Sequence, residues 1–167
     1  QGPALLMLHG HPQNHMMWHK VVPALSEHFT LVTADLRGYG DSDKPVSPPS
    51  ESLYSKRIMA QDMRELMVSL GFNKFAVLAH DRGARVAHRL GLDHPDAVLG
   101  MMLLDIAPTL AMYRQTNEAF ARAYWHWFTL IRPTPFPETL IESDPELYLR
   151  SVMGARSAGM KPFPPEV

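Results

Sequence analysis

Short apolar runs alternate along the chain with segments in which apolar residues recur every three or four positions. The runs are hydrophobic at nearly every position, as is typical of strands buried on both faces of a parallel sheet, and they cover residues 4–8, 29–34, 75–79 and 98–106. Helical spacing fills the intervals, with one helix at residues 17–25 interrupted or restarted at Pro23. This alternation predicts an α/β fold in which a parallel sheet is flanked by helices.

The most regular helical pattern lies between the second and third runs. Apolar residues at helical spacing form one face: Ile58, Met59, Met63, Leu66, Met67 and Leu70. Polar residues take the opposite face: Lys56, Arg57, Gln61, Arg64 and Glu65. Ser52 or Ser55 is suited to cap the start of this helix, and Gly71 is suited to end it. We interpret the methionines as core packing.

From Pro108 onward the pattern becomes purely helical. A stripe of apolar and aromatic residues predicts one helix through Phe120, Ala123, Tyr124, Trp127, Phe128 and Ile131, with His126 at the edge of the stripe. Prolines at residues 133–137 end it, and another helical piece begins at residues 144–151. We therefore expect a core domain at residues 1–108 and a helical cap or lid at residues 109–167.

Composition narrows the classes of function. The chain has 167 residues, 46% of them hydrophobic and 20% charged, which is ordinary for a globular domain. A net charge of −1, without any basic run, argues against a nucleic-acid partner. The absence of cysteine excludes disulfides and thiolate metal sites and is compatible with the cytoplasm, where we expect the protein. No apolar segment approaches the ~20 residues that span a bilayer, so we expect no membrane partner.

The third apolar run leads into the segment that suggests chemistry. Asp81 follows the strand and is flanked two positions away by Ala79 and Gly83, the pattern of a nucleophile elbow. A carboxylate at the elbow predicts displacement at a saturated carbon, because the resulting ester can be hydrolysed to regenerate the enzyme. The alternative is that Asp81 only caps the helix that follows.

Two other strand ends carry candidate residues. Histidines at positions 9, 11, 15 and 19 follow the first strand and invite a metal site, although the continuation typical of metallohydrolases is absent. Alternatively, the backbone N–H of His11 serves an oxyanion hole. Asp105 ends the fourth strand, at the same sheet edge as His11 and Asp81, where it could orient a histidine or cap the next turn.

A glycine-rich segment follows the second strand, at residues 35–45. It has no lysine at the spacing of a phosphate-binding loop. We interpret it as structural: Asp35 and Arg37 would hold a tight loop, with Gly38 and Gly40 supplying unusual backbone angles.

Taken together, these motifs resemble those of fluoroacetate dehalogenases in the α/β-hydrolase superfamily. The resemblance rests on His9-Gly10-His11-Pro12-Gln13-Asn14, Asp35-Leu36-Arg37-Gly38-Tyr39-Gly40-Asp41-Ser42, His80-Asp81-Arg82-Gly83-Ala84-Arg85, Asp105-Ile106-Ala107-Pro108-Thr109 and Tyr124-Trp125-His126-Trp127. The first two motifs are common in the superfamily. The third is narrower, because epoxide hydrolases and haloalkane dehalogenases usually have Asp-Trp where this chain has Asp81-Arg82.

The resemblance implies a role for each of seven residues. Asp81 would be the nucleophile and Asp105 the acid of the triad. Arg82 and Arg85 would bind the substrate carboxylate, as two guanidinium groups on one helix face can. His126 and Trp127 would bind the halide. The backbone N–H groups of His11 and Arg82 would bind the oxyanion.

The implied reaction is hydrolysis of fluoroacetate or haloacetate to glycolate and halide through an aspartyl ester. Its partner is a small haloacid, with no cofactor and no metal, and a homodimer is compatible with the full-length protein. The histidine base and a halide-pocket tyrosine of the family have no match in this chain. We therefore expect a fragment that lacks the first strands and the C-terminal part and is inactive alone. Epoxide hydrolysis and a catalytically incomplete domain are the alternatives.

Overall fold

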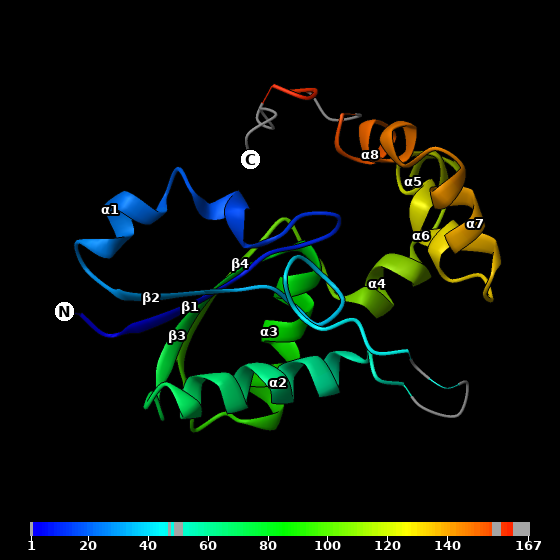
Figure 1. The fold of residues 1–167 in the computed structure, drawn as a ribbon. Coiled ribbons are helices and arrows are strands. Elements are labelled where there is room, and N and C mark those ends of the chain that lie inside the picture. Colours follow the sequence, from blue (N-terminus) through cyan, green and yellow to red (C-terminus); the bar gives the residue numbers. More distant parts are fainter. Residues whose placement is uncertain (1, 47, 49–51, 155–157, 162–167) are drawn as a thin grey trace. The chain divides into compact units, whose positions relative to one another are not determined.

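The computed structural model describes residues 2–46, 48, 52–154 and 158–161. By contacts the chain divides into two compact units, Gln1–Ile106 and Ala107–Val167, each of which is described below by itself. The first unit contains a four-stranded parallel sheet in the order β2-β1-β3-β4 (Figure 1). Its strands are β1 (Ala4–Leu8), β2 (Thr30–Ala34), β3 (Phe75–His80) and β4 (Val98–Leu104). The predicted parallel α/β fold is confirmed.

Helices cover both faces of this sheet (Figure 1). On one face, α2 (Lys56–Ser69) and α3 (Asp81–Asp93) pack against each other and bury apolar side chains of the central strands. The other face is covered by the short helices η1 (His15–Trp18) and α1 (Val22–Ser26). Every residue of β1 is buried, because this strand lies between β2 and β3 and beneath both layers.

The ends of α2 follow the signals in the sequence. Ser55 is the N-cap, and its Oγ accepts the N–H of Ile58 at 3.3 Å. At the other end Gly71 adopts a φ of +87°, and the N–H groups of Gly71 and Phe72 turn back to the carbonyls of Val68 and Met67. This pair of bonds is the Schellman arrangement that ends many helices at glycine.

The helical stretch expected at residues 17–25, interrupted or restarted at Pro23, is two short helices, η1 and α1, with Pro23 in the first turn of the second. One expectation for the first unit was wrong. The fourth strand ends at Leu104, before Asp105, and is largely exposed although it was expected to be buried. Within the described sheet β4 is an edge strand, which explains its exposure.

The second unit consists of helices. They are α4 (Thr109–Arg114), α5 (Glu118–Ala123), α6 (Trp125–Leu130), α7 (Phe136–Ser143) and α8 (Pro145–Met153). The aromatic stripe was expected to form one helix, but the chain bends at Tyr124, with φ −117° and ψ 33°, so α5 and α6 are separate. The helix α7 was missed, because Pro137 was interpreted as a breaker although it lies in the first turn.

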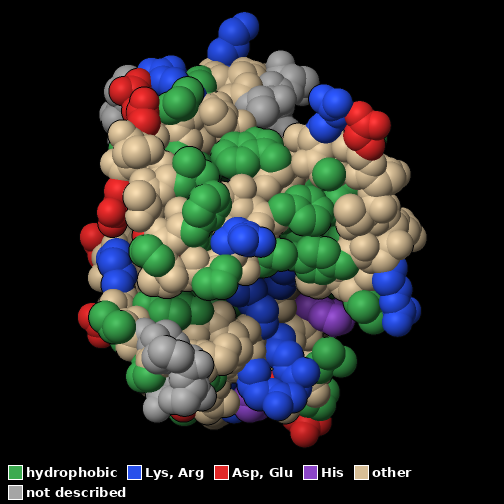
Figure 2. Space-filling model, turned by 90° about the vertical axis from the view of Figure 1, so that its right-hand side faces the viewer, with side chains coloured by type: hydrophobic (Ala, Val, Ile, Leu, Met, Phe, Trp, Pro, Cys, Tyr) green, Lys and Arg blue, Asp and Glu red, His purple; other side chains and the backbone are tan. Residues whose placement is uncertain are grey.

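Apolar side chains are also exposed on the molecular surface, as Figure 2 shows for one face. None of the helices in the described residues is long and apolar enough to span a membrane.

Candidate functional site

The carboxyl ends of three neighbouring strands bring the principal candidate residues to one edge of the sheet. Leu8 of β1 pairs with Ala79 of β3, and His80 of β3 pairs with Leu104 of β4. The residues just beyond these pairs therefore emerge from the same edge, where ligands bind in open α/β sheets. The sequence predicted this convergence, and the register confirms it.

Asp81 stands on a strained turn between β3 and α3. Its φ is +46°, in the left-handed region that side-chain-bearing residues rarely adopt. Gly83 allows the turn, because a Cβ there would lie 2.3 Å from the carbonyl oxygen of His9. Ala79 is fully buried. The predicted elbow is therefore present, and Gly83 is required by close packing against the end of β1.

The Asp81 side chain points to another strand end and not to its own helix. Its Oδ1 accepts the backbone N–H of His11 at 2.9 Å. The N-cap of α3 is His80, whose side chain makes no capping bond. The alternative in which Asp81 caps the helix is therefore wrong. Gly10 makes the approach possible, since a Cβ there would lie 2.4 Å from the Cβ of Asp81.

Arg82 and Arg85 follow Asp81 in α3, as its second and fifth residues. Arg82 Nη1 donates to the Tyr39 hydroxyl at 3.2 Å, and that hydroxyl lies 3.3 Å from His11 Nδ1. Burial raises the pKa of Tyr39, while the charge of Arg82 lowers it, so the phenol stays protonated at neutral pH. Tyr39 thus connects the arginine to the His11 loop.

Lys56 also belongs to this region, which sequence reasoning missed. The polar-face interpretation of Lys56 was wrong, since its side chain is half-buried and its ammonium contacts Met59 Sδ at 3.5 Å. Burial, together with the charges of Arg82 and Arg85, lowers its pKa to about 8, while Asp81 opposes the shift. Helical spacing identified the apolar face of α2, but it could not show which side chains surround Lys56 in its first turn.

Asp105 follows β4 directly and adopts a φ of +50°. Its side chain is 71% exposed, and its Oδ2 lies 3.9 Å from His80 Nε2. His80 Nδ1 is buried and has no hydrogen-bond partner among the described residues. The structure therefore places an imidazole next to Asp105, a pairing that the sequence pattern did not reveal.

The histidines after β1 are engaged separately and do not converge on a metal. His9 is fully buried, and its Nδ1 donates to the Gly10 carbonyl while its Nε2 accepts the Leu36 N–H, both at 3.0 Å. His15 Nδ1 contacts Asp35, and His19 Nδ1 contacts the Met16 carbonyl. Within residues 2–46, 48, 52–154 and 158–161, no three His, Cys, Asp or Glu side chains are grouped as metal ligands.

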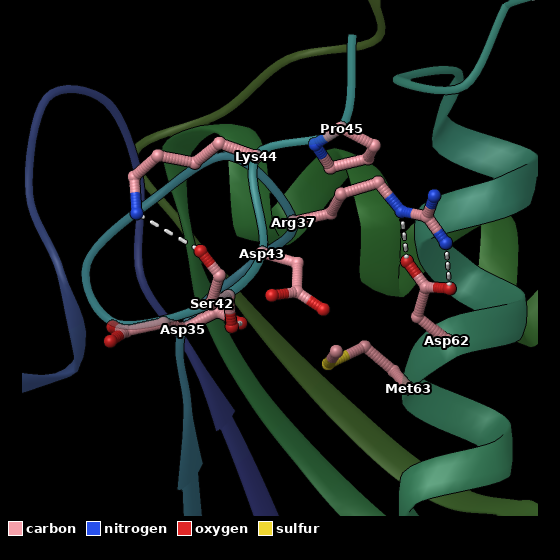
Figure 3. A pocket seen from close by; sticks show the side chains of 8 residues that line it. All are labelled: Asp35, Arg37, Ser42, Asp43, Lys44, Pro45, Asp62 and Met63. Carbon is pink, nitrogen blue, oxygen red and sulfur yellow. Dashed lines mark hydrogen bonds and ion pairs between the residues drawn. The ribbon is translucent and has the colours of Figure 1, made fainter. Parts of the chain in front are cut away.

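The glycine-rich loop is structural, as predicted. The Asp35 carboxylate accepts the backbone N–H groups of His15 at 2.7 Å and Asp41 at 3.0 Å. Arg37 forms a two-bond ion pair with Asp62 of α2, at 2.6 and 2.8 Å (Figure 3). Gly38 and Gly40 have φ values of +86° and +49°.

A cavity of about 670 Å³ lies between this loop and α2 (Figure 3). The residues that line it are Asp35, Arg37, Ser42, Asp43, Lys44, Pro45, Asp62 and Met63. Asp81 is not among them, so this cavity is distinct from the Asp81 site.

His126 and Trp127 belong to α6 of the second unit. Trp127 packs on Tyr113, Tyr124 and Phe120, with ring centroids 5.6, 5.8 and 6.0 Å apart. Packing of Trp127, predicted from the stripe, is confirmed. The His126 ring lies 6.1 Å from Tyr124.

Comparison with known proteins identifies the family to which the chain belongs. A family model described as the alpha/beta hydrolase fold matches residues 3–150. The chain belongs to this family. The α/β-hydrolase fold that the resemblance implied is therefore confirmed.

The relatives of this α/β hydrolase include a dehalogenase and epoxide hydrolases. A fluoroacetate dehalogenase from Burkholderia sp is 51% identical over 99% of this chain and 55% of its own length. A soluble epoxide hydrolase from Corynebacterium sp. (strain C12) is 39% identical over 89% of this chain and 51% of its own length. The crystal structure of ALR0039 from Nostoc sp PCC 7120 superposes with a TM-score of 0.89 at 59% identity, covering 92% of this chain and 53% of that one. The chain spans about half the length of the curated relatives it matches.

Proposed function

We propose that this α/β hydrolase removes halide from a short 2-haloacid, such as fluoroacetate, by way of an ester on Asp81. The observation that carries the proposal is the Asp81 carboxylate on its strained turn, held by the His11 N–H and followed in α3 by Arg82 and Arg85. The similarity to the Burkholderia fluoroacetate dehalogenase supports the same assignment.

In the first step the substrate carboxylate binds to Arg82 and Arg85, which aim the halogen-bearing carbon at Asp81. Because Oδ1 of Asp81 accepts the His11 N–H, Oδ2 is the oxygen that attacks. A carbon–oxygen bond forms as the carbon–halogen bond breaks, and the halide leaves with the bonding electrons. His126 and Trp127 are proposed to donate to the halide.

In the second step water attacks the ester carbonyl carbon of Asp81. The carbonyl oxygen is then the one already bonded to the His11 N–H, so negative charge develops where a donor is in place. The proton of the water goes to the histidine base of the family, which has no match in this chain and which Asp105 would orient. Cleavage of the acyl bond then releases the 2-hydroxy acid and restores the Asp81 carboxylate.

Fluoride release from fluoroacetate by the intact protein tests the proposal. We expect Asp81→Asn to abolish release while the protein still folds, because an amide cannot act as the nucleophile. A single turnover in heavy-oxygen water should label the Asp81 carboxylate, since the product takes its oxygen from Asp81. No halide release from any short haloacid would contradict the proposal.

Epoxide hydrolysis is the second candidate, favoured by the 39% identity with the Corynebacterium epoxide hydrolase. It would use the same ester on Asp81 but needs no group for a substrate carboxylate. Turnover of a neutral epoxide that is unaffected by Arg85→Ala would support it. Loss of haloacid turnover in the same variant would support the dehalogenase.

A further inference from the structure

Tyr39 contacts a residue of the proposed substrate site but has no role in the proposed mechanism. It belongs to the glycine-rich loop after β2, and its ring packs edge-on against the fully buried His9, with the ring centroids 5.2 Å apart. Its backbone N–H donates to the Leu36 carbonyl at 2.9 Å. Contacts within the first unit therefore fix both the ring and the backbone, so the hydroxyl has a defined place.

The Tyr39 hydroxyl has two polar neighbours. Arg82 Nη1 donates to it at 3.2 Å, and His11 Nδ1 lies 3.3 Å away. A guanidinium can only donate, so the oxygen accepts from Arg82, and the single hydroxyl proton is left for the His11 nitrogen. The phenol keeps this proton at neutral pH, because burial raises its pKa. Arg82 is therefore bonded to a neutral group.

This neutral partner distinguishes Arg82 from other arginines of the chain. Several of them pair with a carboxylate: Arg37 with Asp62, Arg89 with Asp93, Arg122 with Glu118 and Arg150 with Glu146. Among the residues that the structure describes, no carboxylate forms an ion pair with Arg82. Its side chain is thus held in place without being neutralised.

A neutral partner suits a guanidinium group that has to bind an anion. A carboxylate partner would cancel the positive charge and compete with an incoming acid for the same N–H groups. A phenol accepts one N–H and leaves the charge and the other N–H groups for the ligand. Because the long side chain is already restricted, binding also costs less conformational entropy.

We propose that Tyr39 is a positioning residue that orients Arg82 for the carboxylate of the bound acid while leaving the charge of Arg82 available. This inference rests on the proposed function and deepens it, since it assigns part of the selection of an anionic substrate to the glycine-rich loop. In this assignment Tyr39 acts through Arg82 and not on the reacting carbon. The effect of Tyr39 should therefore disappear when the Arg82 guanidinium is removed.

The test compares Tyr39→Phe with the control Tyr54→Phe in the intact protein, and urea denaturation verifies that both variants fold. Phenylalanine keeps the ring beside His9 and removes only the hydroxyl. Tyr54 is exposed, and its hydroxyl donates to the Pro45 carbonyl at 2.7 Å. We expect Tyr39→Phe to raise the KM for fluoroacetate roughly tenfold, the lower end of what a hydrogen bond to a charged group contributes, with a smaller change in kcat. Tyr54→Phe should match the parent.

Titration with acetate, followed by NMR, supplies a readout that does not depend on turnover, and it is repeated in an Arg82→Met background. Tyr39→Phe should weaken acetate binding roughly tenfold when Arg82 is present but less than about twofold when it is replaced. An equal loss in both backgrounds would mean a merely structural role and would overturn the inference, as would parent-like KM and acetate affinity for Tyr39→Phe. If the parent releases no halide but Tyr39 and Arg82 remain coupled in acetate binding, the proposed function fails and the role of Tyr39 stands.

Discussion

At the scale of single residues, backbone packing determines where the Asp81 carboxylate points. Gly10 lies just after β1 and Gly83 lies at the start of α3, both next to the elbow. Neither position has room for a methyl group. Tyr39 then links the His11 loop to Arg82 through its hydroxyl. The site is therefore held by contacts between residues that are far apart in the sequence.

Gly10→Ala tests this packing. The added Cβ would lie 2.4 Å from the Cβ of Asp81, so the carboxylate must move away from the His11 N–H. Misplacement of a reacting group by about 1 Å can cost about 100-fold in rate, and we expect a loss of that order in fluoride release. Gly100→Ala is the control, because a Cβ on this β4 residue meets nothing within 4 Å. Parent-like rates for Gly10→Ala would contradict the requirement for glycine.

At the scale of elements, the start of α2 matters for stability as well as for the position of Lys56. Ser55→Ala removes the side-chain acceptor for the Ile58 N–H. We expect the free energy of unfolding to fall by about 1 kcal/mol, the usual value of an N-cap. Urea denaturation measures it, with Ser69→Ala in the last turn of α2 as the control, since Ser69 is exposed and caps nothing at the start of the helix. Equal losses in the two variants would contradict a capping role for Ser55.

The elements that the sequence predicted well are those with an unambiguous period. The strands β1, β2 and β3 could be predicted because their apolar runs are short and bounded by turns, and α2 because its apolar residues recur over many turns. The break between α5 and α6 could not, since Tyr124 continues the same stripe while its backbone leaves the helix. Periodicity reports the face of a residue and not the local backbone angles.

Part of the candidate site could also be predicted, for a different reason, and part of it could not. Asp81 and His11 could be placed together because parallel strands share one carboxyl edge, which needs only the element order. Lys56 and Tyr39 could not, since their positions depend on how α2 and the glycine-rich loop pack against α3. His80 beside Asp105 depends on the exact register of β3 and β4.

At the scale of the whole first unit, the sheet is well covered at its centre and open at one side. The strand β4 leaves apolar side chains exposed, among them Leu99, Met101, Met102 and Leu104. By contrast, β1 and the residues that follow it form the most enclosed part, and the fully buried His9 lies there. Stability in this unit should therefore respond most strongly to changes around β1.

The buried imidazole of His9 makes stability depend on pH. Burial lowers the pKa of His9, against the opposing effects of the Gly10 carbonyl and of Asp35. The folded protein therefore binds fewer protons than the unfolded chain, whose histidine has a pKa of about 6.5, and the free energy of unfolding falls as the pH drops below that value. The loss is at most about 1.4 kcal/mol per pH unit and stops at the lower, folded-state pKa. Protonation would also cost the Leu36 N–H its acceptor.

Urea denaturation between pH 7 and 5 measures this effect in the parent and in His9→Gln. We expect the variant to be less stable at pH 7 but to have a shallower dependence on pH, because glutamine does not titrate. His28→Gln is the control, since His28 is exposed and should leave the slope unchanged. Asp35 acts in a separate, more acidic pH range. Burial raises its pKa, but the N–H groups of Asp41 and His15 and the His15 side chain together lower it below its usual value, so its contribution is lost only as the pH falls below about 4. Parallel pH profiles for the parent and His9→Gln would show that His9 is not the group responsible.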